Sequence, residues 1–450
     1  MATEKEPKPL TTTMSLQDIT TDQETTLKQI WTYLFHLWGI PVDGTNAFKK
    51  DPSLHSLSPQ TSIKSVEKEP KKKSLFGKMY SMTGSSSSSS SSSFPPDSTQ
   101  QHSQHHHHHK LNERLPYTLN MIHPEFKQLT VPPKDTRKLF WEMLRLDPVD
   151  NHILRFARAR KWNTDNTIKM LSKTFQFRLT KKPINEILNK GEATIIKENK
   201  QQGLIKNLEL QKAVIYNHPT ENSACPLIVV RPKFHYSSDQ TEEELEHYAL
   251  LIIELARLFM REHSISILFD LTDFSLSNMD YTPVKFLIAC FEAHYPESLS
   301  HLFVHKAPWL FSPIWSIVKN WLDPVVASKI VFTKNTSELE RFLKPEQIPS
   351  YLGGKNDSID LDHYVKPDGS HDDKLKDKEG LQLVQNQRIE LIDKFVKLTV
   401  DWIQSETDEQ SKELFAERCN VSDDICNNYI ELDPFIRSRS SYDINGLLKL

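Results

Sequence analysis

Five strand-like runs alternate with helical segments between residues 213 and 342 of this chain. The runs are short and rich in β-branched residues, as is typical of buried strands. Parallel strands need a long connection, which is usually a helix. The sequence therefore predicts an α/β domain with a largely parallel sheet over residues 195–360. We expect its strands at 213–216, 227–230, 265–271, 302–305 and 330–333.

Helix-start signals support this interpretation. Thr282-Pro283 and Ser312-Pro313 each place proline after a capping residue, which predicts a helix that begins there. A longer helix is expected at 241–260, where an acidic first turn suits the helix dipole. A short helix is expected at 337–342.

A helical bundle is expected before the α/β domain, over residues 115–185. Helical periodicity marks 134–146 and 151–161, and a third helix begins at Asn163, a favourable N-cap. After the domain, residues 361–378 are polar and predict a linker. Helical periodicity returns at 379–416, so residues 379–450 are predicted to be a helical C-terminal extension in which 430–437 is a docked tail.

Residues 1–40 predict an amphipathic N-terminal helix. Thr21 and Glu24 have the spacing of a capping box, and Gly39 is placed to end the helix. We expect its apolar stripe to pack against the folded part of the chain, with a partner protein or a membrane as the alternative. The stripe consists of Leu27, Ile30, Trp31, Leu34, Leu37 and Trp38.

Residues 41–114 predict a disordered Ser/His-rich linker. Hydrophobic residues make up 37% of the 450 residues, and the chain has only 11 glycine residues. The apolar content is therefore below the roughly 45–50% that is usual for globular domains. The linker includes Ser85–Ser93 and His105–His109, and we predict no metal site in the histidine run. Lysines near Phe76 and Tyr80 could touch anionic lipid, but a solvated linker is the default prediction.

Common catalytic and nucleotide-binding motifs are absent from the sequence, including G-x-S-x-G, H-E-x-x-H and both glycine-rich phosphate loops. The four cysteines form no C-x-x-C pair and are predicted to be free thiols. The N-terminus lacks an apolar signal core, and the longest apolar stretch is too short to span a membrane. A net charge of −3 argues against a nucleic-acid partner. We predict a cytoplasmic protein that is not an enzyme and needs no cofactor.

The segment at 307–323 is unusually apolar. Beyond its first turn, Lys319 and Asn320 are its only clearly polar residues before Asp323. A helix that is apolar on more than one face either lies in the core or separates two apolar environments. Because tryptophan favours the membrane interface, the second interpretation is a lid, at 312–322, between an internal cavity and a membrane.

Residues 154–162 resemble the L-R-F-L-R-A-R-K-F signature of the helical domain that precedes CRAL-TRIO lipid-binding domains. Further matches span about residues 116–360 in that family's order, and the closest resemblance is to its fungal phosphatidylinositol transfer proteins. The resemblance implies a helical bundle on an α/β domain whose sheet floors a large apolar pocket, closed by a gate helix. The further matches are Tyr295-Pro-Glu297, Ala307-Pro308, Leu322-Asp-Pro-Val325, Ser328-Lys329 and Gly353-Gly354.

The same resemblance implies a headgroup site formed by Arg160, Lys161, Glu297 and Lys329. Cations suit a phosphodiester, and a carboxylate can accept hydrogen bonds from inositol hydroxyls. For Arg158 and Arg160 the motif favours phosphate contact, and the alternative is a surface salt bridge. Glu297 could instead pair with Lys329. The implied pocket and gate residues are Ile265, Ile267, Phe269, Trp309, Phe311, Ile314, Trp315, Val318, Trp321 and Val326.

Three of these residues depart from the family pattern. Ile265 and Ile267 stand where carriers of phosphatidylcholine have hydroxyls, which argues against that lipid. Val326 replaces a threonine and removes one donor from the inositol-phosphate site. The more apolar pocket could hold a neutral lipid such as a sterol or an isoprenoid hydrocarbon.

The expected function is extraction of phosphatidylinositol from a membrane, followed by its transfer or presentation. Burying two chains of about sixteen carbons is worth on the order of 25 kcal/mol, so the pocket must open only at a membrane. The alternatives are a carrier or sensor of neutral lipid and a regulator that presents lipid to a lipid kinase, through the N-terminal stripe or the C-terminal helix. We expect peripheral, transient association with the endoplasmic reticulum, endosomes or other internal membranes.

Overall fold

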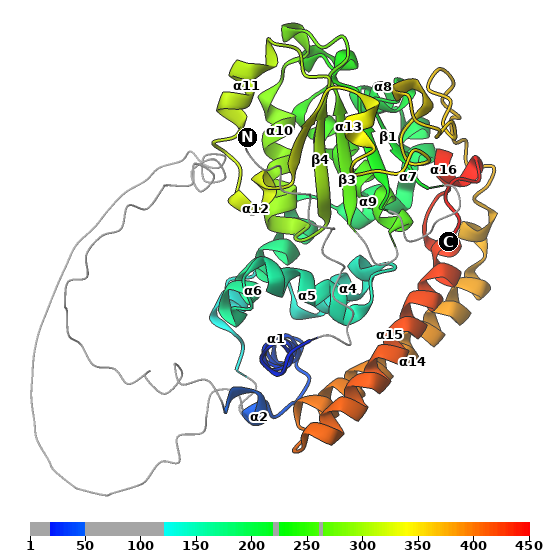
Figure 1. Cartoon of the computed structure of the whole chain (residues 1–450). Helices are drawn as coiled ribbons and strands as arrows, with labels where there is room; N and C mark the ends of the chain where they lie inside the picture. The colour runs from blue at the N-terminus through cyan, green and yellow to red at the C-terminus, as the bar shows by residue number, and fades with distance from the viewer. Residues whose placement is uncertain (1–18, 50–120, 219–224, 261–263) are drawn as a thin grey trace, which may run out of the picture. The chain divides into compact units, whose positions relative to one another are not determined.

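The structure, a computed structural model, describes residues 19–49, 121–218, 225–260 and 264–450 (Figure 1). Within these ranges one sheet has the strand order β1-β2-β3-β4-β5. β1 is antiparallel to β2, and the other neighbouring pairs are parallel, so the predicted largely parallel sheet is confirmed. The strands are β1 (Ala213–Tyr216), β2 (Leu227–Val230), β3 (Ile265–Asp270), β4 (Leu299–His305) and β5 (Ile330–Thr333).

Helices connect the parallel strands and cover one face of the sheet. Right-handed connections between strands in sequential order place every connecting helix on the same face. The opposite face packs against α13 (Thr336–Leu339) and the segment that follows it. The connecting helices are α9 (Glu242–Phe259), α10 (Tyr281–Ala289), α11 (Phe311–Val318) and α12 (Pro324–Ala327).

Two helix starts differ from the prediction. α10 begins at Tyr281 rather than after Thr282, because Asp280 is the N-cap and its carboxylate accepts a hydrogen bond from the Thr282 N–H at 2.9 Å. α11 begins at Phe311 and ends at Val318, so it is shorter than the predicted lid at 312–322. Trp321 and Leu322 lie in the turn that follows it.

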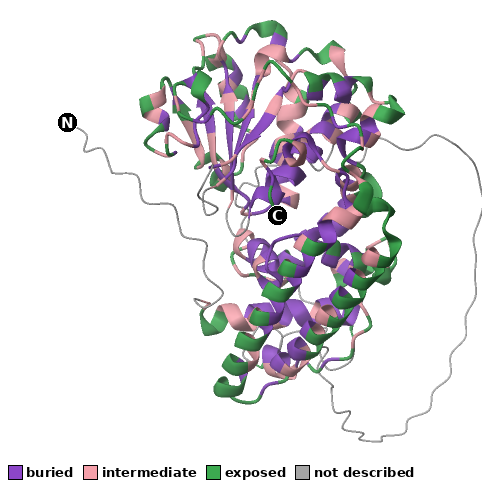
Figure 2. Cartoon of the chain, turned by 90° about the vertical axis from the view of Figure 1, so that its right-hand side faces the viewer, coloured by how far each residue is buried: buried purple, intermediate pink, exposed green. Residues whose placement is uncertain are grey.

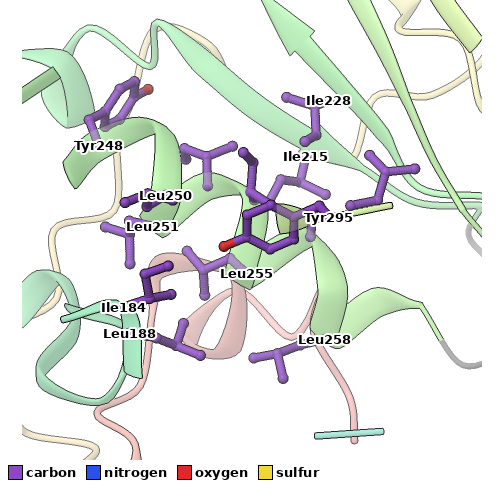
Figure 3. Packing of buried hydrophobic residues seen from close by; sticks show 14 of the residues in the cluster. Ile184, Leu188, Ile215, Ile228, Tyr248, Leu250, Leu251, Leu255, Leu258 and Tyr295 are labelled. Carbon is purple, nitrogen blue, oxygen red and sulfur yellow. The ribbon is translucent and has the colours of Figure 1, made fainter. Parts of the chain in front are cut away.

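Strand side chains alternate between the two faces, as the pleat of a strand requires. Leu227, Leu268 and Phe303 belong to the core on the α13 face. Ile215 and Ile228 point to the other face, where they meet leucines of α9 (Figure 3). The same core includes residues of α7 (Ile184–Glu198), which with α8 (Gln202–Glu209) forms a pair of helices that the sequence patterns did not predict.

The helical bundle before the sheet agrees with the prediction. The Asn163 side chain caps α6, accepting a hydrogen bond from the Asn166 N–H at 2.8 Å. A π-helical turn, Phe177–Lys181, extends α6. The bundle consists of α3 (Pro124–Lys127), α4 (Pro133–Leu144), α5 (Val149–Ala159) and α6 (Thr164–Gln176).

The N-terminal helix α1 (Thr21–Leu37) packs against this bundle, which confirms the expected role of its apolar stripe. Trp31 is fully buried, and its indole N–H donates to Asp150 of α5 at 2.8 Å. The capping box uses Thr20 and Gln23, one residue earlier than predicted. Residues 41–49, which we expected to begin the linker, include α2 (Thr45–Phe48) with its buried Phe48. The rest of the predicted linker lies outside the described residues.

The C-terminal extension is a hairpin of two long helices followed by a short one. α14 (Lys378–Ile403) and α15 (Asp408–Ile436) run side by side (Figure 1). Exposed residues follow the outer sides of the helices, whereas the strands are largely buried (Figure 2). Most of the predicted tail at 430–437 lies inside α15. None of the described helices is both long enough and apolar enough to cross a bilayer.

The end of the chain covers the outer edge of β1. The Tyr442 hydroxyl, in α16 (Ser441–Ile444), accepts a hydrogen bond from the Ile215 N–H at 2.9 Å. Tyr248 of α9 accepts one from the Ala213 N–H at 2.8 Å. The preceding residue of the tail, Ser441, donates its N–H to the buried Glu192 of α7 at 2.8 Å. The two tyrosine contacts satisfy donors that an edge strand would otherwise expose.

Candidate lipid-binding site

An apolar cavity lies between the sheet and the helices α9, α10 and α11. Its volume is about 230 Å³. Successive strand residues point to opposite faces of the sheet, and the side chains that floor the cavity lie on the face opposite the α13 core. The strand residues that line it are Ala213, Ile228, Val230, Ile267, Phe269, Leu299, Leu302, Val304 and Ile330.

Most of the predicted pocket and gate residues lie at this cavity. Ile265 does not line it: it lies on the same face of β3 but is fully buried in the adjoining core. Trp309 precedes α11 and is 89% exposed. Trp321 follows α11 and packs against Tyr281. The predicted residues that do line the cavity are Ile267, Phe269, Phe311, Ile314, Trp315, Val318 and Val326.

The helix α11 forms one wall of the cavity. Ile314 and Val318 are buried on its inner side. Large apolar side chains are exposed on α11, in the segments that flank it and on β5, where Phe332 packs against Trp315 of α11. We call these residues the gate patch: Trp309, Ile317, Val325 and Phe332. Because isolated exposed apolar residues are ordinary but a group of them marks an interaction surface, the gate patch is a candidate contact surface.

Three charged residues lie at the amino-terminal ends of β4 and β5. Glu297 precedes β4, Lys329 precedes β5, and Arg158 lies on α5. Burial lowers the pKa of Lys329, and the Glu297 carboxylate opposes that shift. Burial and Arg155 lower the pKa of Arg158, and Glu297 again opposes the shift. Glu297 therefore lies within electrostatic range of both cations.

The cations of this group are not neutralised by close pairing. In the described part of the chain, Glu297 forms no ion pair within 4.0 Å with either Lys329 or Arg158, so the predicted alternative of a Glu297–Lys329 pair is not formed. The Nη1 atom of Arg158 is buried and has no hydrogen-bond partner among the described residues. A buried donor without a partner is costly, which makes this group suited to an anionic ligand.

The other two predicted headgroup residues form no hydrogen bond or ion pair with Glu297 or Lys329 in the described part of the chain. Arg160 ends α5, and its guanidinium donates to the carbonyls of Ala159 at 3.1 Å and Glu292 at 3.4 Å. Lys161 is exposed and has a φ of 52°. For Arg158, as for Arg160, the family motif favoured phosphate contact, with a surface salt bridge as the alternative. The spacing of Arg158 from Arg155, three residues earlier on the same helix face, is a signal in the sequence that could also have identified it.

Among the described residues, neither the cysteines nor the metal-ligating side chains form a further site. All four cysteines are free, as predicted. Among the described residues, no group of three or more His, Cys, Asp or Glu side chains could hold a metal ion. The histidine run His105–His109 and the lysine-rich segment near Phe76 and Tyr80 lie outside the residues that the structure describes.

Two protein-family models match this chain, one over the sheet domain and one before it. The family model of the CRAL/TRIO domain matches residues 210–354, and that of the CRAL/TRIO N-terminal domain matches residues 109–173. The crystal structure of Sfh5 covers 54% of this chain and 82% of its own, with 17% identity and a TM-score of 0.39.

Two curated fungal proteins are similar over most of their length. The phosphatidylinositol transfer protein CSR1 of Eremothecium gossypii is 43% identical over 438 residues, which is 97% of this chain and 98% of that protein. A CRAL-TRIO domain-containing protein of Schizosaccharomyces pombe is 35% identical over 318 residues, covering 70% of this chain and 69% of that protein. The protein therefore belongs to the CRAL-TRIO family.

Proposed function

We propose that this protein takes phosphatidylinositol from a membrane into the apolar cavity and transfers it to another membrane. The observation that carries the proposal is the pairing of an apolar cavity with an under-neutralised cationic group at the amino-terminal ends of β4 and β5. The 43% identity to a phosphatidylinositol transfer protein supports it.

In this proposal the headgroup lies against Arg158, Glu297 and Lys329. Arg158 and Lys329 donate to the phosphate, and the Glu297 carboxylate accepts hydrogen bonds from inositol hydroxyls. Arg160 and Lys161 stay as predicted contributors at the margin, because Arg160 is held by two main-chain carbonyls. The acyl chains lie along the sheet face, beside Ile267 and Phe269.

The gate patch is proposed to contact the membrane while α11 moves. Moving acyl chains from a bilayer to an apolar cavity is nearly neutral, whereas passing them through water costs on the order of 25 kcal/mol for two chains. Opening must therefore occur while the cavity mouth is covered by lipid. Peripheral and transient contact with internal membranes, such as the endoplasmic reticulum or endosomes, is part of the same proposal.

We expect Ile317→Glu to slow lipid transfer between vesicles about tenfold, because a charge at a lipid-contacting position costs more than about 1.4 kcal/mol. The matched control is Leu383→Glu on α14, which changes a residue that is also exposed, at 62%. Equal transfer rates for the two variants would remove the gate patch from the mechanism.

Mass spectrometry of lipid that co-purifies with the full chain from a eukaryotic host tests the function itself. We expect phosphatidylinositol at about one molecule per chain, and transfer of that lipid between vesicles. A sterol or hydrocarbon in place of phospholipid would overturn the phosphatidylinositol assignment and establish the second candidate, a neutral-lipid carrier. That candidate is favoured by Ile267 and Val326, which present only methyl groups to the cavity.

The third possibility, presentation of lipid to a kinase, needs a free partner surface. The N-terminal stripe does not supply one, because Leu27, Ile30 and Trp31 are fully buried against the rest of the chain. The C-terminal hairpin would have to supply it, through exposed residues of α14 such as Leu383 and Ile389.

A further inference from the structure

Four buried arginines lie together where the helical bundle meets α9. Arg145 follows α4, Arg155 is in α5, Arg178 is in the π-helical turn and Arg257 is in α9. Their side chains are only 3–6% exposed. Among the described residues, their partner carboxylates are Glu254 and Asp147, whose side chains are 0% and 8% exposed.

The two carboxylates are shared among the four arginines. Glu254 accepts hydrogen bonds from Arg145 Nε at 2.8 Å, Arg178 Nη2 at 2.5 Å and Arg257 Nη1 at 3.2 Å. Asp147 accepts from Arg257 Nη2 at 3.0 Å and from Arg155 Nη2 at 3.3 Å. Each carboxylate is thus already hydrogen-bonded to more than one guanidinium.

This cluster carries two more positive charges than negative ones. A guanidinium does not lose its proton in a protein, so the excess cannot be removed by titration. The nearby carboxylate of Glu297 does not neutralise the excess charge, because it already interacts with two further cations, Arg158 and Lys329. Uncompensated charge in the interior is strongly unfavourable, which calls for an anion in the cluster.

A small cavity opens within the cluster, beneath the turn that carries Glu297. Its volume is about 10 Å³, enough for one particle the size of a water molecule. Arg155, Arg178 and Arg257 line it, together with His152 and Asp147, and the Asp147 carboxylate is bound to Arg155 and Arg257. The Nε of Arg155 and the Nε2 of His152 are buried and have no hydrogen-bond partner in the described part of the chain.

We propose that this cavity binds one monatomic anion, a chloride ion, held by the Arg155 Nε–H and the surrounding guanidinium groups. The size of the cavity excludes phosphate and carboxylate groups. Arg155 also donates from Nη1 to the carbonyl of Glu297 at 3.1 Å. A bound anion would therefore fix both Arg155 and the turn before β4. The site does not depend on which lipid the larger cavity holds.

The test compares thermal unfolding of the full chain in sodium chloride and in sodium gluconate at equal ionic strength. We expect a saturable increase in Tm of about 2–4 °C in chloride. Arg155→Lys keeps the charge but removes the Nε donor, and should raise the half-saturating chloride concentration at least tenfold. Arg137→Lys, at a half-exposed arginine of α4, is the matched control and should leave it unchanged.

Bromide provides a second measurement that needs no variant. Crystals of the protein soaked in sodium bromide should show an anomalous peak between Arg155 and His152. A water molecule there, with equal Tm in the two salts, would overturn the proposal. An anomalous peak without any chloride dependence in solution would mean binding only at crystal concentration, and would also overturn it.

Discussion

Lys329→Ala is expected to lower phosphatidylinositol uptake about 10- to 100-fold. The expected loss follows from removing one charged hydrogen bond to the headgroup phosphate, which is worth about 1.5–3 kcal/mol. Lys329 is held in a partly desolvated position opposite Glu297, where its charge is less screened than at the surface. Uptake is measured with labelled phosphatidylinositol in vesicles and the purified full chain.

Two comparisons make this expectation specific. Lys319→Ala removes an exposed lysine at the end of α11 and should leave uptake unchanged. Arg158→Gln should reduce uptake as Lys329→Ala does, whereas Arg160→Gln should reduce it less. The reverse order for the two arginines would return the phosphate to the position that the family motif suggests. Normal uptake by Lys329→Ala with an unchanged Tm would contradict the headgroup site.

Glu254→Gln is expected to destabilise the protein by about 3–5 kcal/mol, because it leaves buried guanidinium groups without their counter-charge. Burial alone would raise the pKa of Glu254, but Arg178, Arg257 and Arg145 hold it well below its usual value. The carboxylate is therefore ionised at neutral pH. Its hydrogen bond from the Tyr295 hydroxyl, at 2.8 Å, ties the turn before β4 to α9 as well.

Urea denaturation followed by circular dichroism measures this effect. The matched control is Glu346→Gln, which removes an exposed carboxylate that pairs with Lys355 at 3.2 Å and should not change the midpoint. A midpoint for Glu254→Gln equal to that of the unchanged protein would mean that the cluster contributes nothing to stability.

The fold was predictable where one local rule was enough. All five strands were found because β-branched runs such as those at Ile265 and Ile330 are short and bounded by turn residues. The Asn163 cap was predicted from another local rule, the preference of asparagine for the N-cap position. Helices α7 and α8 were missed, and the start of α10 was misplaced because a cap-proline pair at Thr282 competed with the stronger Asx cap of Asp280.

The site was only partly predictable. Ile267 and Phe269 follow from the alternation of a strand once its cavity face is known. Ile265, on the same face, was included because the family resemblance implied it, and the strand pattern cannot say where the cavity ends. Periodicity also cannot reveal the arginine cluster, because Arg145 and Glu254 are 109 residues apart in sequence. The sequence also could not decide whether Arg158 or Arg160 faces the headgroup. That depends on where α5 ends, because Arg158 lies within the helix and Arg160 is its C-cap.

The tail that covers β1 means that the folding unit is larger than the domain that the family model matches. The CRAL/TRIO match stops at residue 354, yet the Ile215 N–H is satisfied by Tyr442, far beyond that boundary. A fragment cut at residue 354 exposes an unpaired strand edge beside the lipid cavity. Such an edge invites pairing with a second copy, so a truncated lipid carrier is driven toward self-association rather than toward transfer.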